Sequence, residues 1–207
     1  NFLGSQEIYQ RSLLTLQSLE TLSLEVLNTS ISLGYTAIES GFPAAAEEEF
    51  TTALLIAAES ETALVGLERA QLLPEVLALL VRGISSHENG ELETALDFYT
   101  QASIIDPAHT GANDAVAQTN IDILDRDFLN FMSNGFSSIQ NNSPETALVY
   151  FNQALTLKHE SSDALSAITQ AATMITSRDL TIQLNAAQEY EAGERWQEAL
   201  EAFNNAI

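Results

Sequence analysis

Residues 83–103 read GISSHENGELETALDFYTQAS, and this stretch contains the pattern that decides the fold. Gly83 opens it, Ala95 follows twelve positions later, Tyr99 comes four positions after that alanine, and Ala102 three positions further on. Apolar residues recur at three- and four-residue spacing here and along the chain, which is the period of an α-helix, and the alternation typical of strands is hard to find. The sequence therefore predicts an all-α protein.

The same pattern occurs four times in the 207 residues. Residues 34–54 and 135–155 align with residues 83–103 without a gap, and residues 187–207 follow the same plan. The equivalent small, alanine, aromatic and alanine positions are Gly34, Ala46, Phe50 and Ala53; Gly83, Ala95, Tyr99 and Ala102; Gly135, Ala147, Phe151 and Ala154; and Ala187, Ala199, Phe203 and Ala206. Such self-similarity is typical of a solenoid, in which each helical unit buries its apolar face against the next.

This pattern resembles the tetratricopeptide repeat (TPR) family. The match includes the turn glycine of the family at Gly41 and Gly90, an aromatic residue after the turn at Trp196, and the Asp-Pro pair that ends the second helix at Asp106 and Pro107. The resemblance implies antiparallel helix pairs that pack closely through small residues and stack into a right-handed solenoid. The first and third units lack the proline, and the third has asparagine at the turn, which weakens local capping rather than the fold.

The repeat is longer than the family's. The first repeat alanines, Ala46, Ala95, Ala147 and Ala199, are separated by 49, 52 and 52 residues, whereas TPR units repeat about every 34 residues. We therefore predict one extra helix per unit, which makes three helices per repeat and leaves the curvature of the solenoid open. Pro74 is predicted to begin the helix that carries residues 80–87, because proline is favoured in the first turn of a helix.

The chain is predicted to form one domain, because no linker rich in Gly, Pro or Ser divides it. The predicted organisation of residues 1–207 is a leading helix at 1–22, unit 1 at 23–73, unit 2 at 74–124, unit 3 at 125–178 and a partial unit 4 at 179–207.

The charge is strongly acidic, with 7 basic residues against 29 acidic ones and a net charge of −22. Unaided nucleic-acid binding is excluded, since phosphate contacts need a basic face, and an anionic membrane surface is disfavoured for the same reason. Charged partners should be basic. The apolar stretches are far shorter than the roughly 20 residues of a membrane span, so no direct membrane insertion is expected.

The cellular compartment stays open on this evidence. Extreme acidity with a single lysine suits a bacterial protein, in the periplasm or the cytoplasm. A start at Asn1 rather than Met is compatible with a signal, an anchor or an initiator removed from a longer protein, so the soluble part of an anchored protein is also an option.

No catalytic constellation is found, so we do not expect an enzyme. The three histidines, His87, His109 and His159, are isolated in the sequence and do not recur at metal-ligand spacing. The glycines form no phosphate-binding loop, and cysteine is absent. Carboxylates are so abundant that any chosen pair is most simply solvated helix surface. We therefore predict no cofactor and no metal.

The resemblance to TPR proteins also suggests a binding surface, because the first helix of each pair in that family lines a groove. It places nine residues there: Ile31, Tyr35, Ile38, Leu80, Ile84, His87, Met132, Phe136 and Ile139. This lining is apolar, unlike the basic one of TPR domains that clamp the acidic C-termini of heat-shock chaperones. It suits an amphipathic helix or an extended peptide with apolar anchors and basic flanks. Burial in the core, or under the extra helix, carries equal weight.

The C-terminal stripe Trp196, Leu200, Phe203 and Ile207 lacks a following helix to cover it, whereas repeat arrays normally end in a polar cap. We therefore expect self-association through this end, unless the natural protein continues or another chain covers the stripe.

The function predicted from all these features is a non-catalytic TPR-like scaffold that binds a protein or peptide. The alternative is an accessory or regulatory repeat domain of a larger enzyme or membrane-anchored complex.

Overall fold

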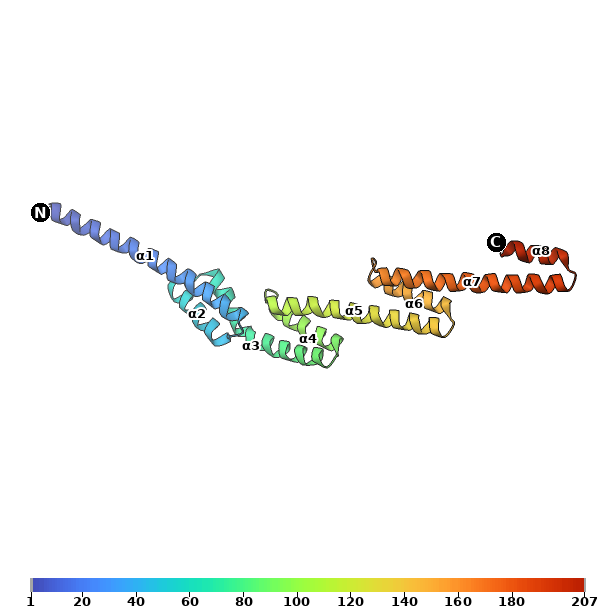
Figure 1. Cartoon of the computed structure of the whole chain (residues 1–207). Helices are drawn as coiled ribbons and strands as arrows, with labels where there is room; N and C mark the ends of the chain where they lie inside the picture. Colours follow the sequence, from blue (N-terminus) through green and yellow to red (C-terminus); the bar gives the residue numbers. More distant parts are fainter. Residues whose placement is uncertain (1, 207) are drawn as a thin grey trace. The chain divides into compact units, whose positions relative to one another are not determined.

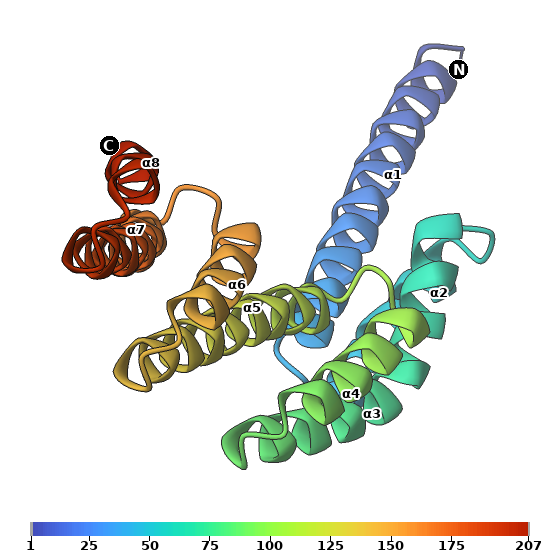
Figure 2. The same ribbon diagram turned by 90° about the vertical axis from the view of Figure 1, so that its right-hand side faces the viewer.

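The computed structural model describes residues 2–206, and the regular elements in that range are eight α-helices, with no strand (Figure 1). They are α1 (Phe2–Glu39), α2 (Pro43–Ile56), α3 (Glu61–Glu88), α4 (Leu92–Ile105), α5 (Thr110–Gln140), α6 (Pro144–Leu157), α7 (Ser162–Ala192) and α8 (Trp196–Asn205). Neighbouring helices in the sequence pack together, as α4 does along α3 (Figure 2). The all-α prediction is confirmed.

The chain forms two compact units, residues 1–120 and residues 121–207. Each has its own apolar core. In the first unit, one cluster joins α1, α2 and α3 through residues such as Ile38 and Phe50, and a second joins α3, α4 and α5 through Val76 and Ala112. In the second unit, a cluster around Phe151 joins α5, α6 and α7.

Long and short helices alternate, and this corrects the prediction of three helices per repeat. Helix α3 runs for 28 residues through Pro74, and α5 and α7 each run for 31 residues without a break. Likewise, the predicted leading helix at 1–22 is part of α1, which ends at Glu39. The extra segment of each unit is therefore the first half of a long helix, and the repeat is one long helix followed by one short helix.

Pro74 fails to break α3 because packing continues on both sides of it. A proline inside a helix removes one hydrogen bond and costs about 3 kcal/mol. Leu73 and Val76 flank Pro74 and are fully buried, and Ala70 and Leu79 extend the same buried stripe by another turn in each direction. Each buried aliphatic side chain of this size contributes about 1.5–3 kcal/mol, so together they outweigh the cost of the proline.

The short helices pack by inserting an aromatic ring against the backbone of the long ones. Phe50 on α2, Tyr99 on α4 and Phe151 on α6 are buried. A Cβ atom built on Gly83 would lie 2.3 Å from the Tyr99 ring, and one on Gly135 would lie 2.3 Å from the Phe151 ring. The glycine that opens each of the first three repeats is therefore needed for this close approach.

Four turns of the same geometry join each long helix to the short helix after it. In the first turn, the Gly41 N–H donates to the carbonyl of Ile38 at 3.0 Å and the Phe42 N–H donates to that of Ala37 at 2.9 Å, which is the Schellman arrangement. The equivalent bonds recur after α3, α5 and α7. The left-handed position is held by Gly41, Gly90, Asn142 and Glu194, with φ of 75°, 80°, 54° and 60°. The turns predicted at Gly41 and Gly90, and at the asparagine of the third unit, are confirmed.

Candidate partner-binding grooves

The structure distributes the nine predicted groove residues over three levels of exposure. Ile84 and Phe136 are exposed, by 50% and 42% respectively. Ile38 is fully buried in the core of the first unit, so it offers no surface to a partner, and Met132 is 7% exposed. The half-buried members are Ile31, Tyr35, Leu80, His87 and Ile139.

Met132 and Phe136 line a groove between α5 and α7, here called the α5–α7 groove, with a volume of about 420 Å³. Its lining residues are Phe128, Leu129, Met132 and Phe136 from α5 and Asp163, Ser166, Ala167 and Gln170 from α7. Met132 belongs to the core cluster, whereas Leu129 and Phe136 are exposed. The groove thus combines a buried apolar base with two accessible apolar side chains.

The position of Phe136 is fixed from below by the short helix. Its ring packs edge-on against Phe151 of α6, with ring centroids 5.1 Å apart and planes at 65°. Phe151 is itself fully buried and held against Gly135. The same packing that builds the repeat therefore orients the exposed ring of the groove.

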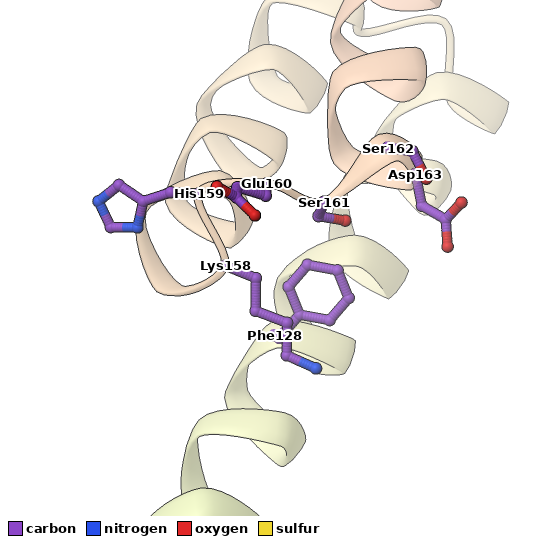
Figure 3. Close-up of a pocket in the computed structure, with 7 residues that line it drawn as sticks. All are labelled: Phe128, Lys158, His159, Glu160, Ser161, Ser162 and Asp163. Atoms are coloured by element: carbon purple, nitrogen blue, oxygen red, sulfur yellow. The ribbon is translucent and has the colours of Figure 1, made fainter.

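A second hollow of about 650 Å³ adjoins the groove at Phe128 and Asp163 and is formed by the loop between α6 and α7 (Figure 3). Lys158 lies beside the Phe128 ring, with its Nζ 4.7 Å from the ring centroid, and His159 points away from both. Lys158 Nζ is also 2.9 Å from an oxygen of Asp125. Its charge is therefore already compensated within the unit.

The surroundings of the groove are acidic. Residues 121–207 contain twelve acidic and four basic side chains, a net charge of −8. Each of the four basic side chains has a carboxylate partner: Arg126 pairs with Asp127, Lys158 with Asp125, Arg178 with Glu145 and Asp179, and Arg195 with Glu198. Within the part of the chain that the structure describes, Asp163 in the groove and Glu160 in the adjoining hollow form no ion pair, so this side of the groove is acidic.

In the first unit, Ile84 and His87 line an equivalent groove between α3 and α5, here called the α3–α5 groove, with a volume of about 320 Å³. Its other lining residues are Glu88, Tyr99, Ala115, Gln118 and Thr119. The position of Ile84 in the repeat is that of Phe136, 52 residues later. A carboxylate, an imidazole and a phenol contribute to this lining, from Glu88, His87 and Tyr99. Burial, and then the charge of Glu88, raise the pKa of Tyr99.

The corresponding place between α1 and α3 is filled by the protein itself. The Arg69 guanidinium lies over the Tyr35 ring at 5.5 Å from its centroid, and the Tyr35 hydroxyl donates to the carbonyl of Thr62 at 3.1 Å. Arg69 Nε donates to both oxygens of Asp106, at 2.9 and 3.0 Å, and Arg69 Nη2 lies 3.6 Å from Glu39. Tyr35 is therefore engaged in an internal network.

Sequence reasoning missed most of the lining of each groove. Phe128, Leu129 and the contributions of α7 were not predicted, because the resemblance to TPR proteins pointed to only three positions in each of the first three units. The signal was present in the alignment of residues 111–122 with 163–174, which places Ala115 and Gln118 at the same repeat positions as Ala167 and Gln170.

The predicted self-association stripe is exposed as far as the structure describes it. Trp196, Leu200 and Phe203 are accessible on α8, and Ile207 lies outside the described residues. Ala199 and Ala202 are the residues of α8 that are buried.

Among residues 2–206, no helix combines the length and the apolar character needed to cross a membrane, and no group of three or more potential metal-ligating side chains is found. His109 is buried at the start of α5, where its Nδ1 accepts a hydrogen bond from the Ala112 N–H at 3.2 Å.

In comparisons with known proteins, no family model matches the sequence, and no curated protein gives a significant match.

Proposed function

We propose that this protein is a non-catalytic, TPR-like scaffold that binds an amphipathic helix of a partner protein in the α5–α7 groove. The observation that carries the proposal is the juxtaposition of exposed Leu129 and Phe136 over buried Met132 in a groove of about 420 Å³. The lining is mostly apolar with a few polar groups, which suits the apolar face of an amphipathic helix.

Charge complementarity supports a basic partner. Asp163 in the groove and Glu160 in the adjoining hollow are not neutralised within the described part of the chain, and the second unit is acidic as a whole. A helix that places apolar side chains at positions i, i+3 and i+4 in the groove and lysine or arginine on its flanks would satisfy both features.

The relationship to TPR proteins is part of the proposal, as is the right-handed sense of stacking. It is supported by four copies of the small, alanine, aromatic and alanine pattern and by the four matching turns between long and short helices. The insertion of Phe50, Tyr99 and Phe151 against small residues of the long helices is consistent with it.

The test uses a labelled synthetic peptide that forms an amphipathic helix, with leucine on one face and lysine on the other. Fluorescence anisotropy at 150 mM salt measures its affinity for the whole chain. Leu129→Ala and Phe136→Ala should each weaken binding about tenfold, because an apolar side chain buried by the peptide contributes about 1.5–3 kcal/mol.

Leu165→Ala is the matched control, since Leu165 is an exposed leucine on α7 that does not line the groove. It should bind the peptide as the unchanged protein does. A scrambled peptide of the same composition should bind more weakly than the amphipathic one. Equal binding by the groove variants, with thermal unfolding showing that they are folded, would reject this site.

A further inference from the structure

One charged side chain that lies between consecutive long helices in the first repeat is absent from the second. With the 49-residue offset, Glu39 corresponds to Glu88 and Arg69 corresponds to Gln118. In the first repeat, the space between α1 and α3 holds the Arg69 side chain, which is only 16% exposed. Its Nε donates to Asp106, and its Nη2 lies 3.6 Å from Glu39. The protein thus shows directly that an arginine side chain fits between consecutive long helices beside this carboxylate.

The second repeat keeps the carboxylate but lacks the arginine. Gln118 stands where Arg69 would be, and the α3–α5 groove of about 320 Å³ is open there. Glu88 lines it and forms no ion pair within the described residues of the first unit. Its acidic charge is therefore available to a ligand.

Tyr99 provides a second, independent polar group. The residue is 5% exposed and lines the groove, and its hydroxyl forms no hydrogen bond within the described part of the chain. Phe50 takes the equivalent place in the first repeat, so the hydroxyl is specific to the open groove. A phenol oxygen accepts a hydrogen bond from a cationic donor, which a guanidinium can supply.

We infer that the α3–α5 groove binds an arginine side chain of a partner polypeptide, with the guanidinium between the Glu88 carboxylate and the Tyr99 hydroxyl. The methylene stem lies against Ile84 and Ala115, which are apolar parts of the lining. This inference rests on the proposed function only in that the ligand is a polypeptide.

Arginine is favoured over lysine because its planar group offers several donors in a fixed geometry and is less strongly hydrated. The third repeat has glutamine at both equivalent positions, Gln140 and Gln170, and the larger ring of Phe136 in place of Ile84. Its groove therefore suits an apolar anchor, and the two grooves select different side chains.

The test is an NMR titration of the whole chain at neutral pH with N-acetyl-arginine amide as the probe. The expected result is a saturable shift of the Ile84 methyl and Gln118 side-chain amide signals. N-acetyl-lysine amide should bind at least about threefold more weakly, and N-acetyl-norleucine amide should produce no shift there.

Two variants make the inference falsifiable. Glu88→Gln should weaken arginine binding about fivefold or more, because a charge-assisted hydrogen bond is lost. Glu75→Gln, an exposed glutamate on α3 outside the groove, should leave it unchanged. Gln118→Arg should place an arginine side chain of the protein itself in the groove and abolish binding of the probe.

Probe binding that is absent, or that is insensitive to both Glu88→Gln and Gln118→Arg in folded protein, would overturn the inference. Failure of the proposed function is separately detectable. Leu129→Ala and Phe136→Ala act on the α5–α7 groove and should leave the arginine titration as it is.

Discussion

The space between α1 and α3 and the space between α5 and α7 lie at the same position in the repeat, but one is filled by a side chain of the protein and the other is an open groove. The first is closed by Arg69, which lies over Tyr35 and is bound to Asp106, whereas the second is open and presents Phe136. The aromatic rings of the short helices pack in the same way in both, with T-shaped contacts at 5.0 and 5.1 Å. The difference teaches that a few side-chain replacements on a shared framework decide whether a repeat is structural or available for binding.

The largest predicted effect comes from removing Arg69, the side chain that fills the space between α1 and α3. Arg69→Met leaves Asp106, whose side chain is 3% exposed, as a buried carboxylate without its cation. We expect a loss of about 3–5 kcal/mol in the free energy of unfolding of the first unit, measured by urea denaturation.

Lys158→Met is the matched control on the open side, because the Lys158–Asp125 pair is about half exposed. An exposed pair contributes about 0–1 kcal/mol, so this variant should change stability little. The double variant Arg69→Met with Asp106→Asn should recover part of the loss. Equal small effects of Arg69→Met and Lys158→Met would contradict the contrast between the two places.

The next prediction tests the shared framework. Gly135→Ala would place a Cβ atom 2.3 Å from the buried ring of Phe151, so the ring and its helix must shift. Overpacking of this kind costs about 1–3 kcal/mol, measured as a lower midpoint of chemical unfolding. Gly4→Ala is the control, since a Cβ atom there meets nothing within 4 Å. A second change, Phe151→Leu, should relieve the strain, and an unchanged midpoint in Gly135→Ala would refute the close approach.

A smaller effect tests whether the turn between α7 and α8 is equivalent to the other three. Glu194 takes the left-handed position that glycine holds at Gly41 and Gly90, with φ of 60°. Because left-handed backbone is costly for a residue with a Cβ, Glu194→Gly should stabilise the contact of α7 with α8 by about 0.5–1 kcal/mol. Hydrogen exchange of the α8 amides is the measurement, with slower exchange expected. Faster exchange would show that this turn differs from the other three.

The smallest predicted effect concerns an exposed ion pair between α6 and α7. A hydrogen bond from Arg178 on α7 lowers the pKa of Glu145 on α6. A carboxylate with a lowered pKa stabilises the folded state at neutral pH, and this contribution is lost as the pH falls through that pKa. In Arg178→Gln, the Glu145 pKa followed by NMR should rise toward its ordinary value. An unaltered titration curve would show that the two helices are not linked by this pair.

The sequence made the framework predictable, because it is set by local rules. Helical periodicity indicated the all-α fold, and glycine or asparagine marked the turns at Gly90 and Asn142. The number of helices was not predictable from Pro74, since the buried stripe around it, visible only in the packed structure, keeps α3 continuous.

The two grooves were harder to predict, because they depend on contacts between distant segments. Arg69 closes its place through Asp106, which lies 37 residues away in the sequence. Phe128 and Leu129 become groove residues only because the first half of α7 packs beside α5. Aligning the repeats does show where one residue replaces another, as Gln118 replaces Arg69. It does not show whether the side chain at that position fills the space between the long helices.

The two methionines of the chain permit the most direct test of the proposed binding groove. Met132 lies at the base of the α5–α7 groove, and Met174 is on α7 outside its lining. With ¹³C-methyl-labelled methionine, titration of the whole chain with the leucine and lysine peptide should shift the Met132 signal to saturation and leave the Met174 signal in place. A peptide that binds by anisotropy while the Met132 signal stays fixed would contradict the account.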